Sequence, residues 1–104
     1  MSKKSVKNLI LYHIKQRKKS NPIRSKELSY KLGCSDVHIR DAVHELRTKD
    51  NVPVCSGGQG YYFPTDISEA RHSINHLRSR ARKMMDAANG MEKHYLKEEQ
   101  TSLI

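Results

Sequence analysis

Apolar residues in the first half of the chain recur at the three- and four-residue spacing of amphipathic helices. Three such stripes are present, formed by Val6, Leu9, Ile10 and Ile14, then by Leu28 and Leu32, and then by Ile39, Ala42, Val43 and Leu46. They predict a first helix over residues 5–19, a second over residues 25–32 and a third that Asp50 closes. Pro22 separates the first two helices, because proline cannot continue a helix.

Polar residues and one glycine mark the ends of the second and third helices. Ser25 and Ser35 are predicted N-caps, since a serine hydroxyl can accept a hydrogen bond from a free backbone N–H of the first turn. Gly33 lies where a left-handed residue would end the second helix, and glycine adopts that conformation at little cost. The sequence therefore predicts two short helices joined by a tight turn.

Two short apolar runs follow the third helix, Val52–Cys55 and Tyr61–Phe63, on either side of the glycine-rich segment Gly57–Gly60. Several glycines permit positive φ angles, so this segment suits the tip of a compact β-hairpin. Pro64 prevents further strand pairing. We also expect residues 23–24 to supply a strand of one or two residues that pairs with this hairpin.

The C-terminal third of the chain has apolar positions at alternating spacings of three and four, which is the heptad seam of a coiled coil. The seam positions are Ile67, Ala70, Ile74, Leu77, Ala81, Met84, Ala88, Met91 and Tyr95. Asp66 and Glu69 fit a capping box at its start. The predicted fold is therefore mainly α with a small β-hairpin (α+β): residues 1–64 form a compact domain, residues 65–98 a coiled-coil helix and residues 99–104 a frayed tail.

The seam allows two interpretations. It forms an intermolecular coiled coil that makes a homodimer, or it packs back onto the first helix of its own chain. A chain of 104 residues with 36% hydrophobic content can bury only a modest core, which favours the dimer. The flanking positions include Arg71, Arg78 and Arg80 with few matching acids, so they do not specify a parallel pairing.

Positive charge is concentrated at the N-terminal end of the chain. The whole sequence carries 20 Lys and Arg against 11 Asp and Glu, a formal net charge of +9. Residues 1–31 hold ten bases and one acid, residues 32–65 three bases and four acids, and residues 66–104 seven bases and six acids. A localised basic surface is typical of proteins that bind polyanions, although a solubilising surface has the same composition.

The segment from Leu32 to Arg47 resembles the helix-turn-helix of winged-helix regulators such as the DNA-binding domain of the biotin-operon repressor. Val52–Cys55 and Gly60–Phe63 are similar to the wing of that family, and the resemblance covers residues 5–64. It implies a winged helix-turn-helix that places its third helix in the major groove of double-stranded DNA. In size and style the chain is similar to small regulators of bacteria and their phages.

That docking geometry implies which residues contact the nucleic acid. The base-contacting candidates on the third helix are Val37, Arg40, Asp41 and His44. Arg40 leads this set, because arginine can donate two parallel hydrogen bonds to a guanine edge. The phosphate-contacting candidates are Ser35, Lys26, Lys31, Arg47, Lys15, Arg17, Lys18 and Lys19, and the wing candidates are Gly58, Gln59, Gly60 and Tyr61.

Acids on the third helix leave a second function open. Asp36, Asp41 and Glu45 lie on or near its predicted outward face, where carboxylates repel phosphate, although an acid can accept a hydrogen bond from a cytosine amino group. The first interpretation is a dimeric DNA binder that regulates transcription or takes part in replication. The alternative is a phage- or plasmid-type adaptor or inhibitor that docks on a host replication or transcription protein. A third is non-specific DNA binding through the basic surface alone.

No catalytic constellation is readable in the sequence, so we do not expect an enzyme. The segment Gly57–Gly60 lacks the Lys-Ser/Thr of a phosphate-binding loop. His72 and His76 have a metal-binding spacing but no third ligand nearby, and Cys34 and Cys55 do not form a CxxC pair. No signal peptide or membrane-spanning window is visible, so we expect a cytoplasmic, nucleoid-associated protein without a metal or cofactor.

Overall fold

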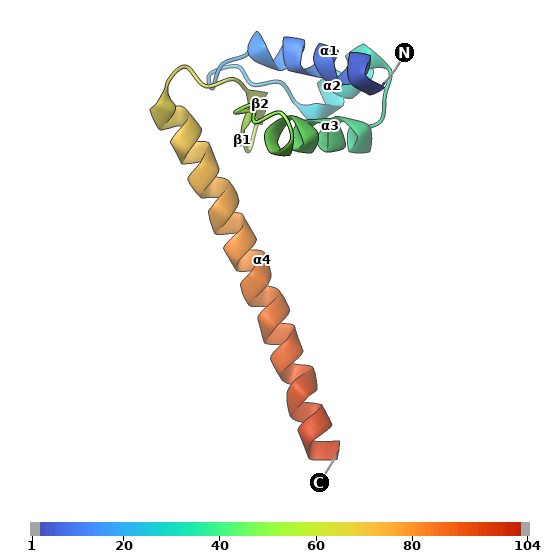
Figure 1. Cartoon of the computed structure of the whole chain (residues 1–104), viewed down its shortest axis with the longest axis vertical. Coiled ribbons are helices and arrows are strands. Elements are labelled where there is room, and N and C mark those ends of the chain that lie inside the picture. Colours follow the sequence, from blue (N-terminus) through green and yellow to red (C-terminus); the bar gives the residue numbers. More distant parts are fainter. Residues whose placement is uncertain (1–2, 103–104) are drawn as a thin grey trace. The chain divides into compact units, whose positions relative to one another are not determined.

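The computed structural model describes the backbone of residues 3–102 and the side chains of residues 4–96. Across these residues the chain forms four helices and one two-stranded antiparallel sheet, so the predicted mainly α chain with a small β-hairpin is confirmed (Figure 1). The chain divides into two compact units, residues 1–73 and residues 74–104. The first turns of the last helix therefore belong to the N-terminal unit.

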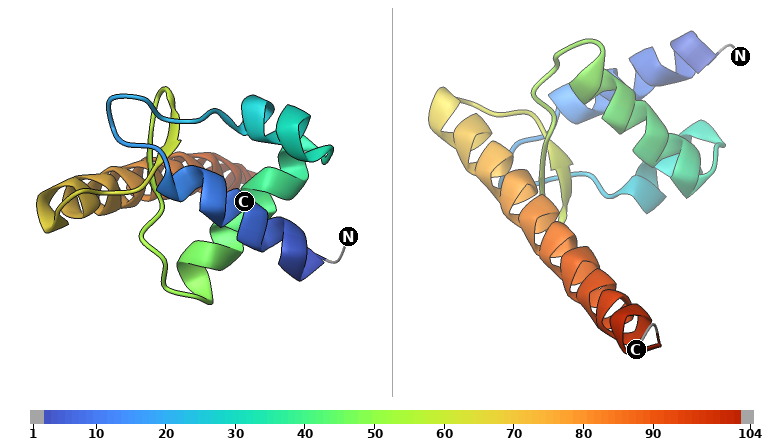
Figure 2. Two further views of the ribbon diagram at one scale, coloured as in Figure 1. Left: turned by 90° about the horizontal axis from the view of Figure 1, so that it is seen from above. Right: turned by 60° about the horizontal axis from the view of Figure 1, so that its bottom comes forward.

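Three helices build the N-terminal unit: α1 (Lys3–Lys15), α2 (Ser25–Leu32) and α3 (Asp36–Thr48). Figure 2 shows α1 and α2 each lying beside α3. Their apolar stripes face one another, because burying apolar surface removes it from water. The buried core consists of Ile10, Ile14, Ile23, Leu28, Ile39, Ala42, Val43, Leu46 and Val54.

The first helix is shorter than its predicted span of residues 5–19. It ends at Lys15, and the Arg17 N–H donates to the Ile14 carbonyl at 3.0 Å, which closes a turn rather than another helical step. The Asn21 side chain then accepts from the Lys18 N–H at 3.0 Å. The basic run over residues 17–19 therefore lies in the connection between α1 and α2, not on a helix.

Two of the three predicted helix-end signals are confirmed. Gly33 adopts φ 64° and ψ 35° and caps the end of α2, and the Ser35 hydroxyl accepts from the His38 N–H at 3.1 Å at the start of α3. The prediction for Ser25 is wrong. Ser25 is already the first residue of α2, and the N-cap position is taken by Arg24, whose side chain makes no capping hydrogen bond.

The hairpin consists of β1 (Cys55–Gly57) and β2 (Gly60–Tyr62), paired so that Cys55 faces Tyr62. The predicted strand start at Val52 is wrong, because the Val52 N–H donates to the Leu46 carbonyl at 2.9 Å and is not free for a sheet. The predicted pairing of residues 23–24 is confirmed in part. Ile23 and Tyr61 exchange two backbone hydrogen bonds of 2.8 Å as an isolated bridge.

The last helix, α4, spans Ile67–Ser102. The predicted capping box at its start is confirmed in part: Asp66 accepts from the Glu69 N–H at 2.8 Å, but Glu69 accepts from the Thr65 N–H at 3.1 Å instead of the Asp66 N–H. Ser73 is buried and accepts from the Ser56 N–H at 3.2 Å, which joins the first turns of α4 to β1. Of the predicted frayed tail, residues 99–102 continue α4, and residues 103–104 lie outside the described residues.

Candidate nucleic-acid interface

The orientation of α3 is set by its buried stripe, and the opposite face is presented to solvent. All four candidates for base contact, Val37, Arg40, Asp41 and His44, are exposed. Val37 is 63% exposed although it is apolar. The α3 face thus offers one guanidinium, one imidazole, one carboxylate and one isopropyl group to a partner.

Arg40 is paired within its own helix. Its Nη2 donates to Asp36 Oδ2 at 3.0 Å, one helical turn earlier, while its side chain stays 66% exposed. Exposed pairs of this kind contribute little to stability, so the guanidinium can exchange this partner for another acceptor. The other oxygen, Asp36 Oδ1, is buried and has no hydrogen-bond partner among the described residues.

Arg47 has a different position from the one predicted for a phosphate contact. Its Nε donates to the Val54 carbonyl at 2.9 Å and its Nη2 donates to the Ser56 hydroxyl at 3.0 Å. Its guanidinium also lies 6.0 Å from the centre of the Tyr61 ring. The structure therefore places Arg47 as the residue that holds the hairpin against the end of α3, a role that no local sequence pattern indicates.

Tyr61 of β2 is half-buried, packs against the hydrophobic core and lies beside the Arg47 guanidinium. Burial raises the pKa of its hydroxyl, and the nearby positive charges of Arg47 and Arg40 act in the opposite direction. The structure thus brings Arg47 of α3 into contact with the wing candidate Tyr61.

The other flank of α3 is acidic but internally compensated. Lys7 of α1 forms ion pairs with Glu45 at 3.2 Å and with Asp50 at 2.9 Å. Hydrogen bonds to Asp50 and then to Glu45 raise the pKa of the Lys7 ammonium. Glu45 is therefore directed toward α1, so its expected place on the outward face is only partly correct.

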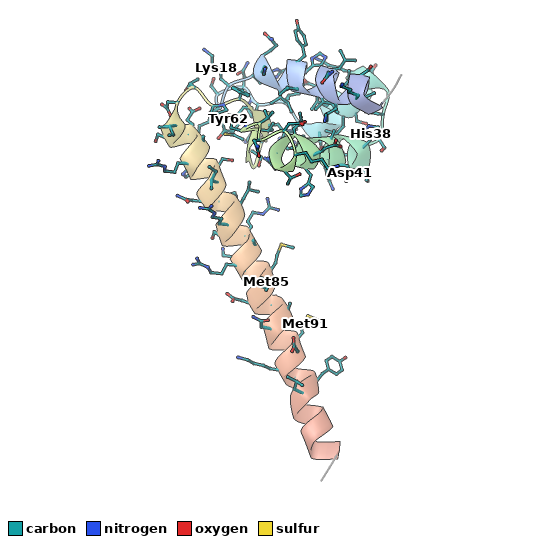
Figure 3. The ribbon with its side chains drawn as sticks, viewed as in Figure 1. Lys18, His38, Asp41, Tyr62, Met85 and Met91 are labelled. Carbon is teal, nitrogen blue, oxygen red and sulfur yellow. The ribbon has the colours of Figure 1, made fainter. Side chains whose placement is uncertain are left out.

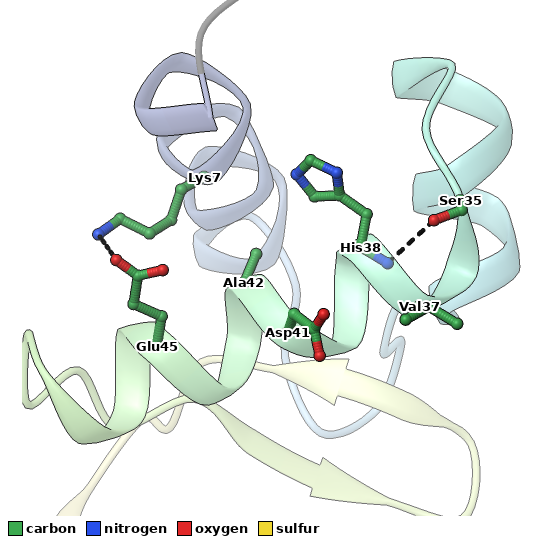
Figure 4. A pocket seen from close by; sticks show the side chains of 7 residues that line it. All are labelled: Lys7, Ser35, Val37, His38, Asp41, Ala42 and Glu45. Carbon is green, nitrogen blue, oxygen red and sulfur yellow. Dashed lines mark hydrogen bonds and ion pairs between the residues drawn. The ribbon is translucent and has the colours of Figure 1, made fainter.

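A hollow of about 270 Å³ lies beside this acidic flank (Figure 4). It is lined by Lys7, Ser35, Val37, His38, Asp41, Ala42 and Glu45. The Lys7 ammonium is already held by Glu45, whereas the Asp41 carboxylate has no ion pair within the described part of the chain. The hollow thus suits an apolar or cationic group better than a phosphate.

The candidates for phosphate contact separate into two groups. Arg17 and Lys31 both pair with Glu27, at 2.9 Å and 3.7 Å. Lys15, Lys18, Lys19 and Lys26 are exposed and have no ion pair among the described residues, and Lys15 lies 5.9 Å from the Phe63 ring centre. Figure 3 labels Lys18 in the connection after α1.

Ser35 and Arg24 lie at the N-cap positions of α3 and α2. The Ser35 hydroxyl oxygen already accepts from His38, but its proton remains able to donate to an anion at this helix start. Arg24 is exposed, follows Ile23 directly and lies at the start of α2. Arg24 was not among the predicted phosphate contacts; its place in the segment 23–24, predicted to pair with the hairpin, is the signal that could have revealed it.

The hairpin tip is a short, exposed turn. Gly58 and Gln59 form the two-residue turn between β1 and β2 and are exposed. Gly60 has φ 135°, and a Cβ atom at this position would lie 2.5 Å from the Ile23 carbonyl oxygen. Glycine is therefore required at Gly60 by the approach of two backbones, while Gly58 and Gln59 are free to contact a partner.

The predicted dimer seam on α4 is exposed along most of its length. Met84 is 71% and Met91 is 68% exposed, and Ile74 is 44% exposed. Ala70 and Leu77 are half-buried, whereas Ala81 and Ala88 are exposed like Ile67. Met85 and Met91 project from the helix in Figure 3.

The cysteines and the described acidic and histidine side chains do not form a metal centre. Within residues 4–96, no group of three or more His, Cys, Asp and Glu side chains could hold a metal ion. Cys34 and Cys55 are free thiols, and burial raises the pKa of the Cys55 thiol. None of the described helices combines the length and the apolar character that crossing a membrane requires.

Comparisons of the chain with protein-family models, with curated proteins and with solved structures find no match. The geometry and charge of the N-terminal unit and of α4 are therefore the observations that bear on function.

Proposed function

We propose that residues 1–64 are a winged helix-turn-helix that binds double-stranded DNA, similar in type to the DNA-binding domain of the biotin-operon repressor. In this proposal α3 enters the major groove, and the hairpin of β1 and β2 is the wing. The order α2, Gly33 turn, α3 and hairpin supports it, and so do the hydrogen bonds that Arg47 of α3 donates to Val54 and to Ser56 of β1. Those hydrogen bonds hold the two DNA-binding elements in a fixed relation.

One observation carries the proposal: ion pairs within the N-terminal unit neutralise four of its acids, whereas a group of its cations stays exposed. Glu27, Asp36, Glu45 and Asp50 are all in ion pairs. Five of the exposed cations without such pairs among the described residues lie in the connection between α1 and α2, at the start of α2 and at the end of α1: Lys15, Lys18, Lys19, Arg24 and Lys26. Lys4 and Lys49 are further exposed cations, at the start of α1 and the end of α3. Exposed cations beside a helix and a hairpin are what the phosphates of a duplex require.

We further propose that α4 pairs with α4 of a second copy, so that a homodimer presents two DNA-binding units to two half-sites. The exposed seam supports this, since an apolar stripe on a 36-residue helix is stable in water when a partner covers it. The biological role would be a small regulator of transcription or a replication-associated DNA binder.

The hollow beside α3 favours a second candidate function. Val37 and Asp41 could receive an apolar and a cationic side chain of a protein, which would make the chain an adaptor or inhibitor docking on a host replication or transcription protein. The two functions share Val37 and Asp41 on the exposed face of α3, but the DNA proposal relies on Arg40 and the adaptor proposal on Asp41. Neutralising Asp41 to Asn should abolish capture of such a protein, whereas it should strengthen DNA binding by removing a repulsive charge.

The first test is selection from a random pool of DNA duplexes at two salt concentrations. Specific binding by a dimer should enrich a motif with two half-sites, and affinity should fall as salt rises because binding releases counterions from phosphates. The absence of any duplex binding at low salt would overturn the DNA proposal. Enrichment of no sequence, together with weak and strongly salt-dependent binding, would leave only a non-specific electrostatic surface.

Arg40 provides the sharpest variant for this test. Arg40→Ala should weaken binding to the selected site by about 1–3 kcal/mol and relax the preference at one base pair. Arg40→Lys is the matched control, because it keeps the charge but loses the bidentate fork. If Arg40→Ala retains full sequence preference, Arg40 is not a base-reading residue. Lys18→Ala should instead reduce the salt dependence without altering the preferred sequence.

A further inference from the structure

The apolar seam of α4 is bordered by charges whose order along the helix is informative. With Ile74, Ala81 and Ala88 as a positions and Leu77, Met84 and Met91 as d positions, the e positions are occupied by Arg71, Arg78, Met85 and Glu92. Residues at e lie beside the seam, where they contact the partner helix and determine its orientation. The e series therefore runs from positive through apolar to negative, with Met85 between Arg78 and Glu92.

We propose that the seam is covered by a second copy of this chain running antiparallel, in the register that places Met85 opposite Met85 of the second copy. The inference rests on the proposed dimer and specifies its geometry. Because antiparallel helices place e positions opposite e positions, Arg78 faces Glu92 of the second copy and Glu92 faces Arg78 of that copy. Two ion pairs related by the two-fold axis therefore flank the Met85 contact.

Neither charge is matched within its own helix. The positions one turn before and after Glu92 are Ala88 and Leu96, and those around Arg78 are Ile74 and Arg82. Among the described residues, neither Arg78 nor Glu92 takes part in an ion pair. Both are exposed, so both are available to a partner helix.

The charge of the whole helix agrees with this orientation. Residues 67–84 carry five bases and one acid, whereas residues 85–102 carry two bases and four acids. An antiparallel pair aligns the basic half of each helix with the acidic half of the other, which is attractive. A parallel pair aligns like with like, and charges of the same sign along neighbouring helices destabilise the pair.

A parallel pair would also leave the two key charges without partners. In that orientation an e position faces the g position five residues earlier in the second helix. Arg78 would then face Ser73, and Glu92 would face Ala87. Ser73 is moreover buried and already accepts from the Ser56 N–H, so it is committed to the N-terminal unit. The seam charges are thus satisfied in the antiparallel orientation and not in the parallel one.

The orientation determines how far apart the two copies of α4 begin. In the register centred on Met85, α4 of each copy begins at Ile67, 18 residues before that contact, so the two helix starts are separated by about 54 Å along the axis at ~1.5 Å per residue. In a parallel pair they would be about 10 Å apart, the ordinary spacing between packed helices. The antiparallel dimer would therefore present its two DNA-binding units at opposite ends.

The test is charge reversal followed by mixing. Arg78→Glu alone, or Glu92→Arg alone, should raise the dimer dissociation constant by roughly tenfold, since two attractive pairs become repulsive. An equimolar mixture of the two variants should regain native affinity as a heterodimer, because each altered helix then matches the other. Sedimentation equilibrium measures all three. The matched controls are Arg82→Glu and Asp86→Arg, at positions away from the seam, and both should leave the dimer unchanged.

The outcomes separate this inference from the function proposed above. If the single variants leave the dimer intact, or the mixture fails to regain affinity, the antiparallel register is overturned while the dimer stands. If the native chain sediments as a monomer at every concentration, the dimer and its orientation both fall, and DNA binding is still decided by the duplex selection. Small-angle scattering of the native dimer gives an independent reading, because opposite ends require a larger radius of gyration than a parallel pair.

Discussion

The helices α3 and α4 carry the same kind of sequence signal but differ in what covers it. Both have apolar residues at spacings of three and four. No member of the α3 stripe is more than 6% exposed, whereas Met84 and Met91 on α4 are 71% and 68% exposed. Hydrophobic period therefore predicts that a helix has an apolar face, but not whether that face is buried by its own chain.

The difference has an energetic meaning. A fully buried aliphatic side chain stabilises a fold by about 1.5–3 kcal/mol relative to an exposed one. The residues of α3 make this contribution to the N-terminal unit itself. Those of α4 can make it when a second helix arrives, so the same residue type is a folding determinant in one helix and an association determinant in the other.

The largest expected effect on stability comes from shortening one isoleucine in α3 and, for comparison, one in α4. Ile39→Ala should lower the free energy of unfolding of the N-terminal unit by about 2–5 kcal/mol, because it removes a fully buried side chain and leaves a cavity. Ile74→Ala should change that quantity by less than about 0.5 kcal/mol and weaken dimerisation instead. Urea unfolding, monitored by the circular dichroism of the tyrosines, measures the free energy of unfolding. Sedimentation measures dimerisation. Equal losses of unfolding free energy would contradict the contrast.

The next effect concerns the hairpin that packs beside α3. Gly60→Ala should destabilise the N-terminal unit by about 1–3 kcal/mol, since its Cβ atom would meet the Ile23 backbone and its φ angle suits glycine. Gly58→Ala is the matched control, because nothing lies within 4 Å of its Cβ position. Thermal unfolding of both variants provides the measurement. A Gly60→Ala protein as stable as Gly58→Ala would rule out the close approach to Ile23.

A smaller effect is expected from the side chain that caps the start of α3. Ser35→Ala should cost about 1 kcal/mol, because the His38 N–H loses the hydroxyl that accepts its hydrogen bond. Ser25→Ala should cost much less, since Ser25 is inside α2 and does not occupy the cap. Amide hydrogen exchange in the first turns of α2 and α3 distinguishes them. Faster exchange after Ser25→Ala than after Ser35→Ala would reverse the assignment of the caps.

The smallest expected effect is a stabilisation, in contrast to the losses above, and it concerns α4. Gly90→Ala should stabilise the helix by about 0.5–1 kcal/mol, because alanine loses less backbone freedom than glycine and nothing lies within 4 Å of the added Cβ atom. Far-UV circular dichroism during heating should show α4 melting later. Earlier melting would indicate that Gly90 contacts a partner helix closely and that an added methyl group disturbs the contact.

Local signals in the sequence predicted most of the fold but less of the site. The apolar stripes of α1, α2 and α3, the Gly33 turn and the Ser35 cap depend on residues close together in the sequence, and each lies where it was expected. The role of Arg47 depends on the Val54 carbonyl and the Ser56 hydroxyl, which the fold brings to it. The pairing of Lys7 with Glu45 likewise joins α1 to α3 across 38 positions. Such contacts have no periodicity, so exposure and charge pairing at the interface became visible only with the structure.

The errors at helix and strand ends have the same origin. The predicted first helix ran through residues 16–19, where the side chain of Asn21 and the N–H of Phe63 capture backbone groups instead. The predicted strand began at Val52, whose N–H is used by the end of α3. In both places a hydrogen bond made possible by the fold outweighed the local preference of the chain.

Gly60 also determines how this sequence can drift over evolutionary time. Its missing side chain makes room for the backbone of Ile23, not for a side chain, so no smaller neighbour can compensate for an added methyl group. Gly57, Gly58 and Gln59 carry no such constraint at their Cβ positions or at the exposed turn. In a lineage that keeps the bridge between Ile23 and Tyr61, the tip of the hairpin can diverge freely while glycine persists at its end. A single invariant glycine after a variable turn would then be the mark by which distant descendants are recognised.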